Sequence, residues 1–151
     1  MREKLNLELK NSIINKNTTS VKTLRLIIAA IKDRDIVARS SGNNVGIDEQ
    51  EIISLLKKMV KQREESIALY KKGNRLDLVQ GEEEEVRIIS NFLPEQLTND
   101  EIIKIVTETI KATEASSIKD MGKVISKLKE NYSQNMDFSI ASKILKEILL
   151  K

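Results

Sequence analysis

The sequence predicts an all-α protein, with an N-terminal bundle of about four helices joined to a small C-terminal domain of three helices. Aromatic residues make up only 3% of the 151 residues, while Leu, Ile, Lys and Glu are abundant, and this composition favours helices over strands. Only five Gly and one Pro are present, so long loops are rare. Apolar residues recur every three or four positions along most of the chain, which is the period of an amphipathic helix.

The first two helices are predicted from apolar stripes separated by polar breaks. Three apolar residues spaced by four predict a first helix to about residue 16: Leu5, Leu9 and Ile13. The polar segment 17–20 breaks this helix and offers N-cap hydroxyls for the next one. The second helix ends near Arg39, and residues 40–46 form the clearest loop in the sequence.

Two longer helices follow in the N-terminal half. Asp48 and Glu51 have the spacing of a capping box, in which each side chain accepts a hydrogen bond from the other residue's backbone N–H. They open a third helix that stops around Gly73. A fourth helix extends to Leu93, because Pro94 cannot continue it.

Capping residues predict three more helix starts in the C-terminal part. Thr98 with Glu101 makes a second capping box, and Ser117 with Asp120 caps the next helix. Asp137 caps the last helix. The sequence therefore predicts three short helices after the proline.

The Leu93-Pro94-Glu95 joint divides the chain into residues 1–94, the N-terminal bundle, and residues 95–151, the C-terminal domain. The second part is near the lower size limit for a domain that folds alone. No apolar signal core follows the N-terminus and no apolar stretch approaches the length of a membrane span, so we expect a cytoplasmic protein that does not enter membranes.

The composition limits the chemistry of the chain. There is no Cys and no His, so thiolate chemistry and the usual general base near neutral pH are excluded. The serines fit N-caps better than nucleophiles, and no phosphate-cradling glycine loop is present. We therefore expect no catalytic residue, no metal and no cofactor. The Glu82–Glu85 run is expected to be a solvated helix face, because adjacent helical positions fan out around the axis.

Four segments carry a resemblance to a known family across nearly the whole chain. They occur in this order: Lys61-Gln62-Arg63, Gly73-Asn74-Arg75-Leu76-Asp77-Leu78, Leu93-Pro94-Glu95-Gln96-Leu97 and Lys119-Asp120-Met121-Gly122-Lys123-Val124. Their order and spacing resemble the YqeY family. The family is similar to the tail of the GatB subunit of the aspartyl/glutamyl-tRNA amidotransferase, which helps grip tRNA while transamidation occurs in a separate cradle domain.

The resemblance implies a helical bundle joined to a three-helix domain, and kinship to carbon–nitrogen ligases that use glutamine as amide donor. This sequence departs from the common family pattern at two places. Residues 132–138 lack the Gly and Arg of a Gly-Arg-x-Asp-Gly-type stretch, and Glu114 replaces the first residue of an expected Gly-Ala turn. We therefore do not expect this chain to make the contacts for which family members use these two segments.

Two sets of cations are candidates for gripping RNA phosphates. The favoured set lies in the tail-like part: Lys119, Lys123 and Lys127, spaced by four on a C-terminal helix, with Lys129 nearby. The other set lies on and after the third predicted helix: Lys57, Lys58, Lys61, Arg63, Lys71, Lys72 and Arg75. For both sets an ordinary solvated helix face is the alternative interpretation.

We expect a tRNA-directed accessory of amidotransferase-type chemistry that supplies binding and positioning. Its partners are then tRNA and an amidotransferase or other protein subunit. A rival interpretation is a protein–protein adaptor whose charged faces dock a partner subunit, and a standalone amidotransferase is the third. Steep weakening by salt distinguishes RNA from a protein partner, whose binding depends more on apolar contact.

Overall fold

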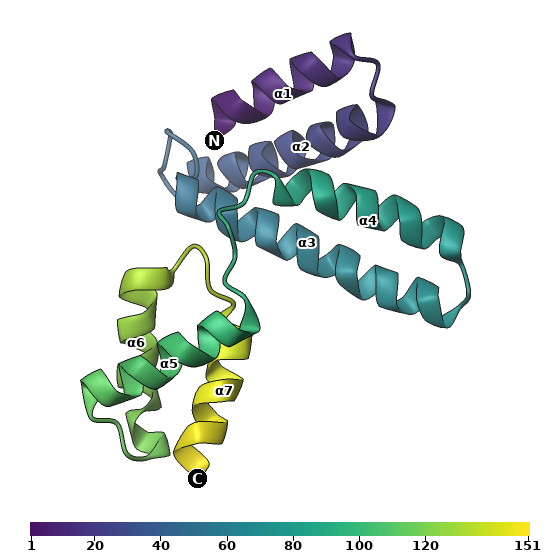
Figure 1. The fold of residues 1–151 in the computed structure, drawn as a ribbon. Coiled ribbons are helices and arrows are strands. Elements are labelled where there is room, and N and C mark those ends of the chain that lie inside the picture. The colour runs from purple at the N-terminus through teal and green to yellow at the C-terminus, as the bar shows by residue number, and fades with distance from the viewer. The chain divides into compact units, whose positions relative to one another are not determined.

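The computed structural model describes residues 1–151 and contains helices but no strands, which confirms the all-α prediction (Figure 1). None of the helices combines the length and apolar character that a membrane span needs. The elements are α1 (Arg2–Ile14), α2 (Thr18–Ser40), α3 (Glu49–Lys72), α4 (Leu76–Ser90), α5 (Asn99–Thr113), the 3-10 helix η1 (Ile118–Asp120), α6 (Met121–Tyr132) and α7 (Phe138–Leu150).

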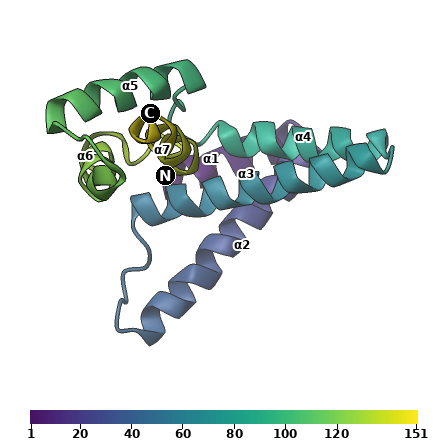
Figure 2. The ribbon, with the colours of Figure 1, turned by 90° about the horizontal axis from the view of Figure 1, so that it is seen from below.

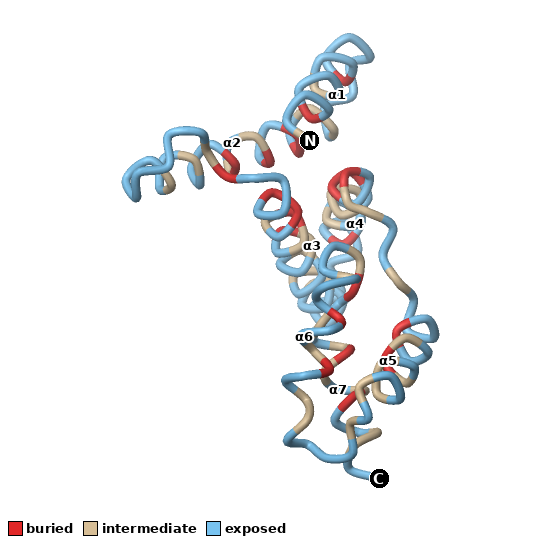
Figure 3. The backbone as a smooth tube through the Cα atoms, turned by 90° about the vertical axis from the view of Figure 1, so that its left-hand side faces the viewer, coloured by how far each residue is buried: buried red, intermediate tan, exposed pale blue.

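The chain forms two compact units, Met1–Leu93 and Pro94–Lys151, each with its own apolar core. In the first unit α3 and α4 form a long antiparallel hairpin (Figures 1 and 2), and α2 contacts α1, α3 and α4. Buried residues recur along these helices and are red in Figure 3. The apolar core of the unit is made of Leu5, Leu24, Ile27, Ile31, Ile47, Ile52, Leu56, Met59, Ile88, Ile89 and Phe92.

Side chains cap the starts of α2 and α3 in the first unit. The capping box of Asp48 and Glu51 is confirmed, with both reciprocal hydrogen bonds present. The cap of α2 differs from the prediction, because the side-chain amide oxygen of Asn17 accepts from the backbone N–H of Ser20. Asn is as good an N-cap as a hydroxyl residue, and it lies one residue before the first available hydroxyl.

The end of α4 also differs from the prediction. The helix ends at Ser90, and the N–H groups of Phe92 and Leu93 instead donate to the carbonyls of Ile89 and Ser90 in tight turns. A residue that precedes proline is disfavoured in the α conformation, so the backbone leaves the helix before Pro94. Phe92 is nevertheless buried in the core of the first unit.

A charged clamp fixes the N-terminus to the end of α2. The guanidinium of Arg2 donates two hydrogen bonds of 2.8 Å to the carboxylate of Asp35 and a third to the carbonyl of Ile47. The N–H of Ile47 donates to Asp35 in turn. Gly46 has φ 100°, and a Cβ there would lie 2.6 Å from Oδ1 of Asp35, so only glycine fits beside the clamp.

The clamp makes stability depend on pH in a defined window. The Arg2 guanidinium, helped by the Ile47 N–H, lowers the pKa of Asp35 from 3.8 to about 2. A lowered carboxyl pKa stabilises the folded state above the unfolded-state pKa, and this stabilisation is lost as pH falls through the folded-state pKa. We expect Asp35→Asn to lower the melting temperature at pH 7, and the difference from the parent to shrink between pH 4 and pH 2.

Thermal unfolding followed by circular dichroism from pH 7 to pH 2 measures this difference. Asp33→Asn is the matched control, because Asp33 is an exposed carboxylate on the same helix that forms no ion pair. A melting-temperature difference for Asp35→Asn that stays constant down to pH 2 contradicts the prediction.

The second unit packs α5, α6 and α7 around one core. The capping box of Thr98 and Glu101 is confirmed, and Asp137 caps α7 by accepting from two backbone N–H groups. The backbone N–H of Thr98 also lowers the pKa of Glu101. Glu114 has φ 53° and ψ 33°, so the turn after α5 is left-handed although a glutamate stands where the resemblance implies the first residue of a Gly-Ala turn. That conformation costs a non-glycine residue about 1 kcal/mol.

Candidate nucleic-acid interface

The favoured lysines lie on two different elements of the second unit. Lys123 and Lys127 are exposed and one turn apart on α6, whereas Lys119 is exposed on η1. The prediction of one helix bearing all three lysines is therefore wrong. The carboxylate of Asp120 accepts hydrogen bonds from the backbone N–H groups of Ser116 and Ser117. The turn that these bonds close is the 3-10 turn η1, which is wound more tightly than an α-helix. The same bonds lower the pKa of Asp120.

Each of the other lysines in this set has a local contact. Nζ of Lys123 donates to the carbonyl of Thr113, at the end of α5, over 3.0 Å. Nζ of Lys127 lies 3.3 Å from Glu130, and Nζ of Lys129 lies 5.9 Å from the centre of the Phe138 ring. The Lys127 pair is exposed, and such pairs contribute little free energy, so a phosphate can replace the carboxylate at small cost.

The net charge of the second unit is zero. Residues 94–151 contain nine Lys and nine Asp or Glu. The net charge of +3 therefore arises entirely in the first unit. Any attraction of a polyanion to the second unit depends on how its lysines are grouped, because its total charge gives none.

Arg63 has a structural role that the sequence did not reveal. Its Nε donates to the carboxylate of Glu85 over 2.8 Å, and its Nη1 donates to the carbonyl of Met59. Both charged side chains are only 14% exposed, and Lys22 of α2 approaches Glu85 to 3.7 Å. Glu85 thus joins α2, α3 and α4, so Arg63 is removed from the set of candidate phosphate ligands.

The remaining cations of the second candidate set, which lie on and after α3, fall into two groups. Lys58 and Lys61 are exposed, and Lys57 is half-buried, near the start and middle of the helix. The others lie at the far end of the α3–α4 hairpin: Lys71, Lys72 and Arg75. The structure therefore does not bring the set together as one patch.

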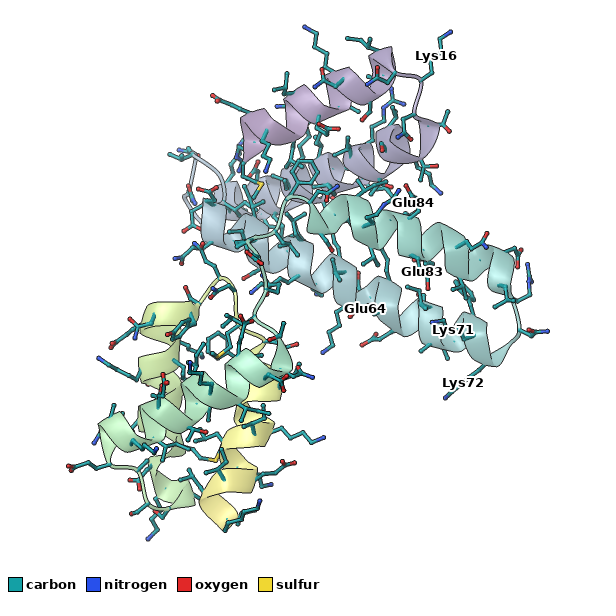
Figure 4. All side chains as sticks on the ribbon, in the orientation of Figure 1. Lys16, Glu64, Lys71, Lys72, Glu83 and Glu84 are labelled. Carbon is teal, nitrogen blue, oxygen red and sulfur yellow. The ribbon has the colours of Figure 1, made fainter.

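Acidic side chains neutralise two of the cations at the hairpin end. Nζ of Lys71 lies 3.8 Å from Glu83, and Figure 4 shows the two side chains between α3 and α4. Arg75 pairs with Asp77 at 3.3 Å and lowers its pKa. Lys72 alone is left exposed without an ion pair at this end.

The glutamate run is divided among different partners. Glu83 faces Lys71, Glu84 pairs with Arg87, and Glu85 is the largely buried junction described above. The expectation of a uniformly solvated face is therefore wrong at Glu85. No group of three or more carboxylates lies close enough to hold a metal ion.

A third set of cations was missed by the sequence reasoning. Arg25, Lys32 and Arg39 are exposed on α2 and recur every seven residues; we call them the α2 basic stripe. None of them forms an ion pair. The seven-residue spacing of these cations is visible in the sequence, but the spacing alone does not show that this side of α2 is exposed.

The fold and these surfaces define a class of protein: an all-α chain of two helical units, rich in exposed cations. The profile of the Yqey-like protein family matches residues 2–149. The chain therefore belongs to the Yqey-like protein family, which confirms the resemblance seen in the sequence.

Curated relatives are fungal proteins named "Altered inheritance of mitochondria protein 41, mitochondrial". The chain is 36% identical to the one from Lachancea thermotolerans over 89 residues, 59% of this chain and 46% of that protein. It is 27% identical to the one from Pyrenophora tritici-repentis, over 97% of this chain and 79% of that protein. The match thus spans about half the length of the Lachancea relative. Because these relatives are named mitochondrial, the cytoplasmic location stays a prediction.

Proposed function

We propose that this chain is a tRNA-binding accessory to amidotransferase-type carbon–nitrogen ligase chemistry, in which a partner enzyme uses glutamine as the amide donor. The chain supplies binding and positioning, and the catalytic centre belongs to the partner. The observation that carries the proposal is the group of exposed ammonium groups on η1 and α6: Lys119, Lys123 and Lys127. These lysines lie in the part that resembles the tRNA-gripping tail of GatB.

The chemistry of these side chains suits phosphate contacts. Ammonium groups hold RNA through its backbone without reading bases. Phe92 is buried, and Phe138 and Tyr132 pack against the core of the second unit. Tyr70 alone is left, which is too little for a platform that stacks successive bases of a single strand. The proposed accessory therefore recognises the folded shape and backbone of tRNA.

A titration of the purified chain with intact tRNA, at about 50 mM and about 200 mM salt, tests this function. We expect saturable binding at low salt that weakens steeply at high salt. Reversing Lys119, Lys123 and Lys127 to Glu should weaken binding about tenfold or more, and should reduce the slope of log affinity against log salt by about 2, because three phosphate contacts are lost.

The matched control reverses Lys104, Lys143 and Lys146, which are exposed on α5 and α7 of the same unit. It changes the net charge equally and leaves the proposed contacts intact. Absence of binding by the parent at low salt refutes the function. An equal loss in the control variant refutes the assignment to the three lysines.

A second candidate function, an adaptor that docks a partner subunit, is favoured by an apolar hollow at the α1–α2 turn. The hollow has a volume of about 590 Å³, and its walls include Ile13 and Leu26, which are 50% and 43% exposed. Cations surround it: Lys16, Lys22 and Arg25. An adaptor should retain its protein partner at salt concentrations that release tRNA, because apolar contact is not screened by salt.

A further inference from the structure

The α2 basic stripe has the geometry of a contact row for an extended polyanion. Seven residues make nearly two turns, so Arg25, Lys32 and Arg39 lie on one side of the helix. Successive cations are about 10 Å apart along the axis, and the row spans about 21 Å. All three side chains are exposed and none forms an ion pair, so each is available to an external ligand.

The surface beside the stripe adds positive charge. Arg25 borders the apolar hollow at the α1–α2 turn together with Lys16, and with Lys22, whose Nζ lies 3.7 Å from Glu85. Lys32 borders a second hollow between α1 and α2 together with Arg2, which is paired with Asp35. No carboxylate lines either hollow, so an anion that approaches here meets cations first.

The two carboxylates near the C-terminal end of α2 do not cancel the stripe. Asp35 interacts electrostatically with Arg39, but it is only 17% exposed and its carboxylate is held by two hydrogen bonds from Arg2. Asp33 is exposed, but it lies about 100° around the helix axis from Lys32. The side of α2 that bears the stripe therefore remains positive along its length.

The spacing of the cations and the setting of α2 select the ligand class. Cations about 10 Å apart cannot converge on one small anion. A membrane-surface helix needs a continuous free apolar face, whereas Leu24, Ile27 and Ile31 of α2 are 0%, 0% and 3% exposed in the core. The apolar residues that α2 does expose are Leu26, Ile36 and Val37, and the carboxylate of Asp33 lies between Leu26 and Val37 along the axis. A protein interface is built around a largely uncharged core, whereas the stripe presents three cations spread over about 21 Å. A nucleic-acid backbone carries a row of phosphates that can meet cations about 10 Å apart, and it needs neither an apolar face nor an uncharged interface core.

We propose that the α2 basic stripe is a second phosphate-binding surface, on the first unit, that grips the backbone of RNA. This inference rests on the proposed tRNA-binding function and adds a contact surface outside the tail-like unit. The guanidinium groups of Arg25 and Arg39 give bidentate contacts to phosphate, and Lys32 gives a point charge between them.

The test is the same tRNA titration with the variant Arg25→Glu/Lys32→Glu/Arg39→Glu in the full chain. We expect affinity to fall about tenfold or more and the salt slope to fall by about 2. The matched control is Lys10→Glu/Arg34→Glu/Arg87→Glu, which changes the charge of the same unit equally at exposed positions outside the stripe. The control should change affinity less than about threefold.

Circular dichroism checks the fold of each variant, and Arg25→Gln/Lys32→Gln/Arg39→Gln replaces the reversal if that variant does not fold. A stripe variant that binds tRNA like the control overturns the inference, while the proposed function stands if the parent binds. Failure of the parent to bind tRNA at low salt overturns both. Loss of binding to phosphatidylserine vesicles with tRNA binding unchanged also overturns the inference, in favour of a lipid surface.

Discussion

The variant Glu85→Ala is expected to lose about 3 kcal/mol of unfolding free energy, because it leaves the guanidinium of Arg63 without its counter-ion in a largely buried place. Glu85 and Arg63 are each 14% exposed and joined over 2.8 Å. The variant also removes the carboxylate that Lys22 approaches from α2. Equilibrium unfolding in urea measures the loss.

Glu83→Ala is the matched control two residues away on the same helix. Glu83 is 53% exposed and lies 3.8 Å from Lys71, and exposed pairs contribute less than about 1 kcal/mol. The double variant Arg63→Met/Glu85→Leu should recover most of the lost stability, since apolar residues can replace a buried pair at little cost. Equal losses for Glu85→Ala and Glu83→Ala contradict the role given to the junction.

Leu145→Ala is expected to destabilise the second unit by about 3 kcal/mol through loss of buried area and a residual cavity. Leu145 is 0% exposed in a core made only of residues from this unit. A unit of 58 residues, Pro94–Lys151, has little stability to spare. Hydrogen exchange followed by mass spectrometry should therefore show faster exchange across α5, α6 and α7.

The control for this prediction is Leu150→Ala on the same helix. Leu150 is 61% exposed, so its truncation should change stability by no more than about 0.5 kcal/mol. Exchange in residues 1–93 should be unchanged by Leu145→Ala, because the two cores share no residue. Equal acceleration in both units contradicts the assignment of Leu145 to a separate core.

Features set by neighbouring residues could be predicted from the sequence. The caps at Asp48, Thr98 and Asp137 depend on atoms within three residues, and all three are confirmed. Local chemistry also produced the errors: the cap of α2 falls on Asn17 instead of a hydroxyl, and Asp120 accompanies a 3-10 turn that separates Lys119 from α6. In each case two local conformations compete, and the difference in free energy between them is small.

Features set by packing between helices could not be predicted. Arg63 and Glu85 are 22 positions apart and meet only when α3 packs against α4. The same packing separates the α3 cations into two groups and pairs Lys71 with Glu83. The α2 basic stripe was predictable in principle from its seven-residue spacing. Which side of α2 faces water, however, depends on the helices that cover the other side.

The separate cores also bear on the order in which the chain folds during synthesis. Every core residue of the first unit lies at or before Leu93, and every core residue of the second lies after it. The first unit can therefore complete its core while the ribosome is still making α5, α6 and α7. Its helical hairpins join segments close in sequence, and such topologies fold in microseconds to milliseconds. A nascent chain paused after the first unit has emerged already holds the Glu85 junction and the α2 basic stripe in place.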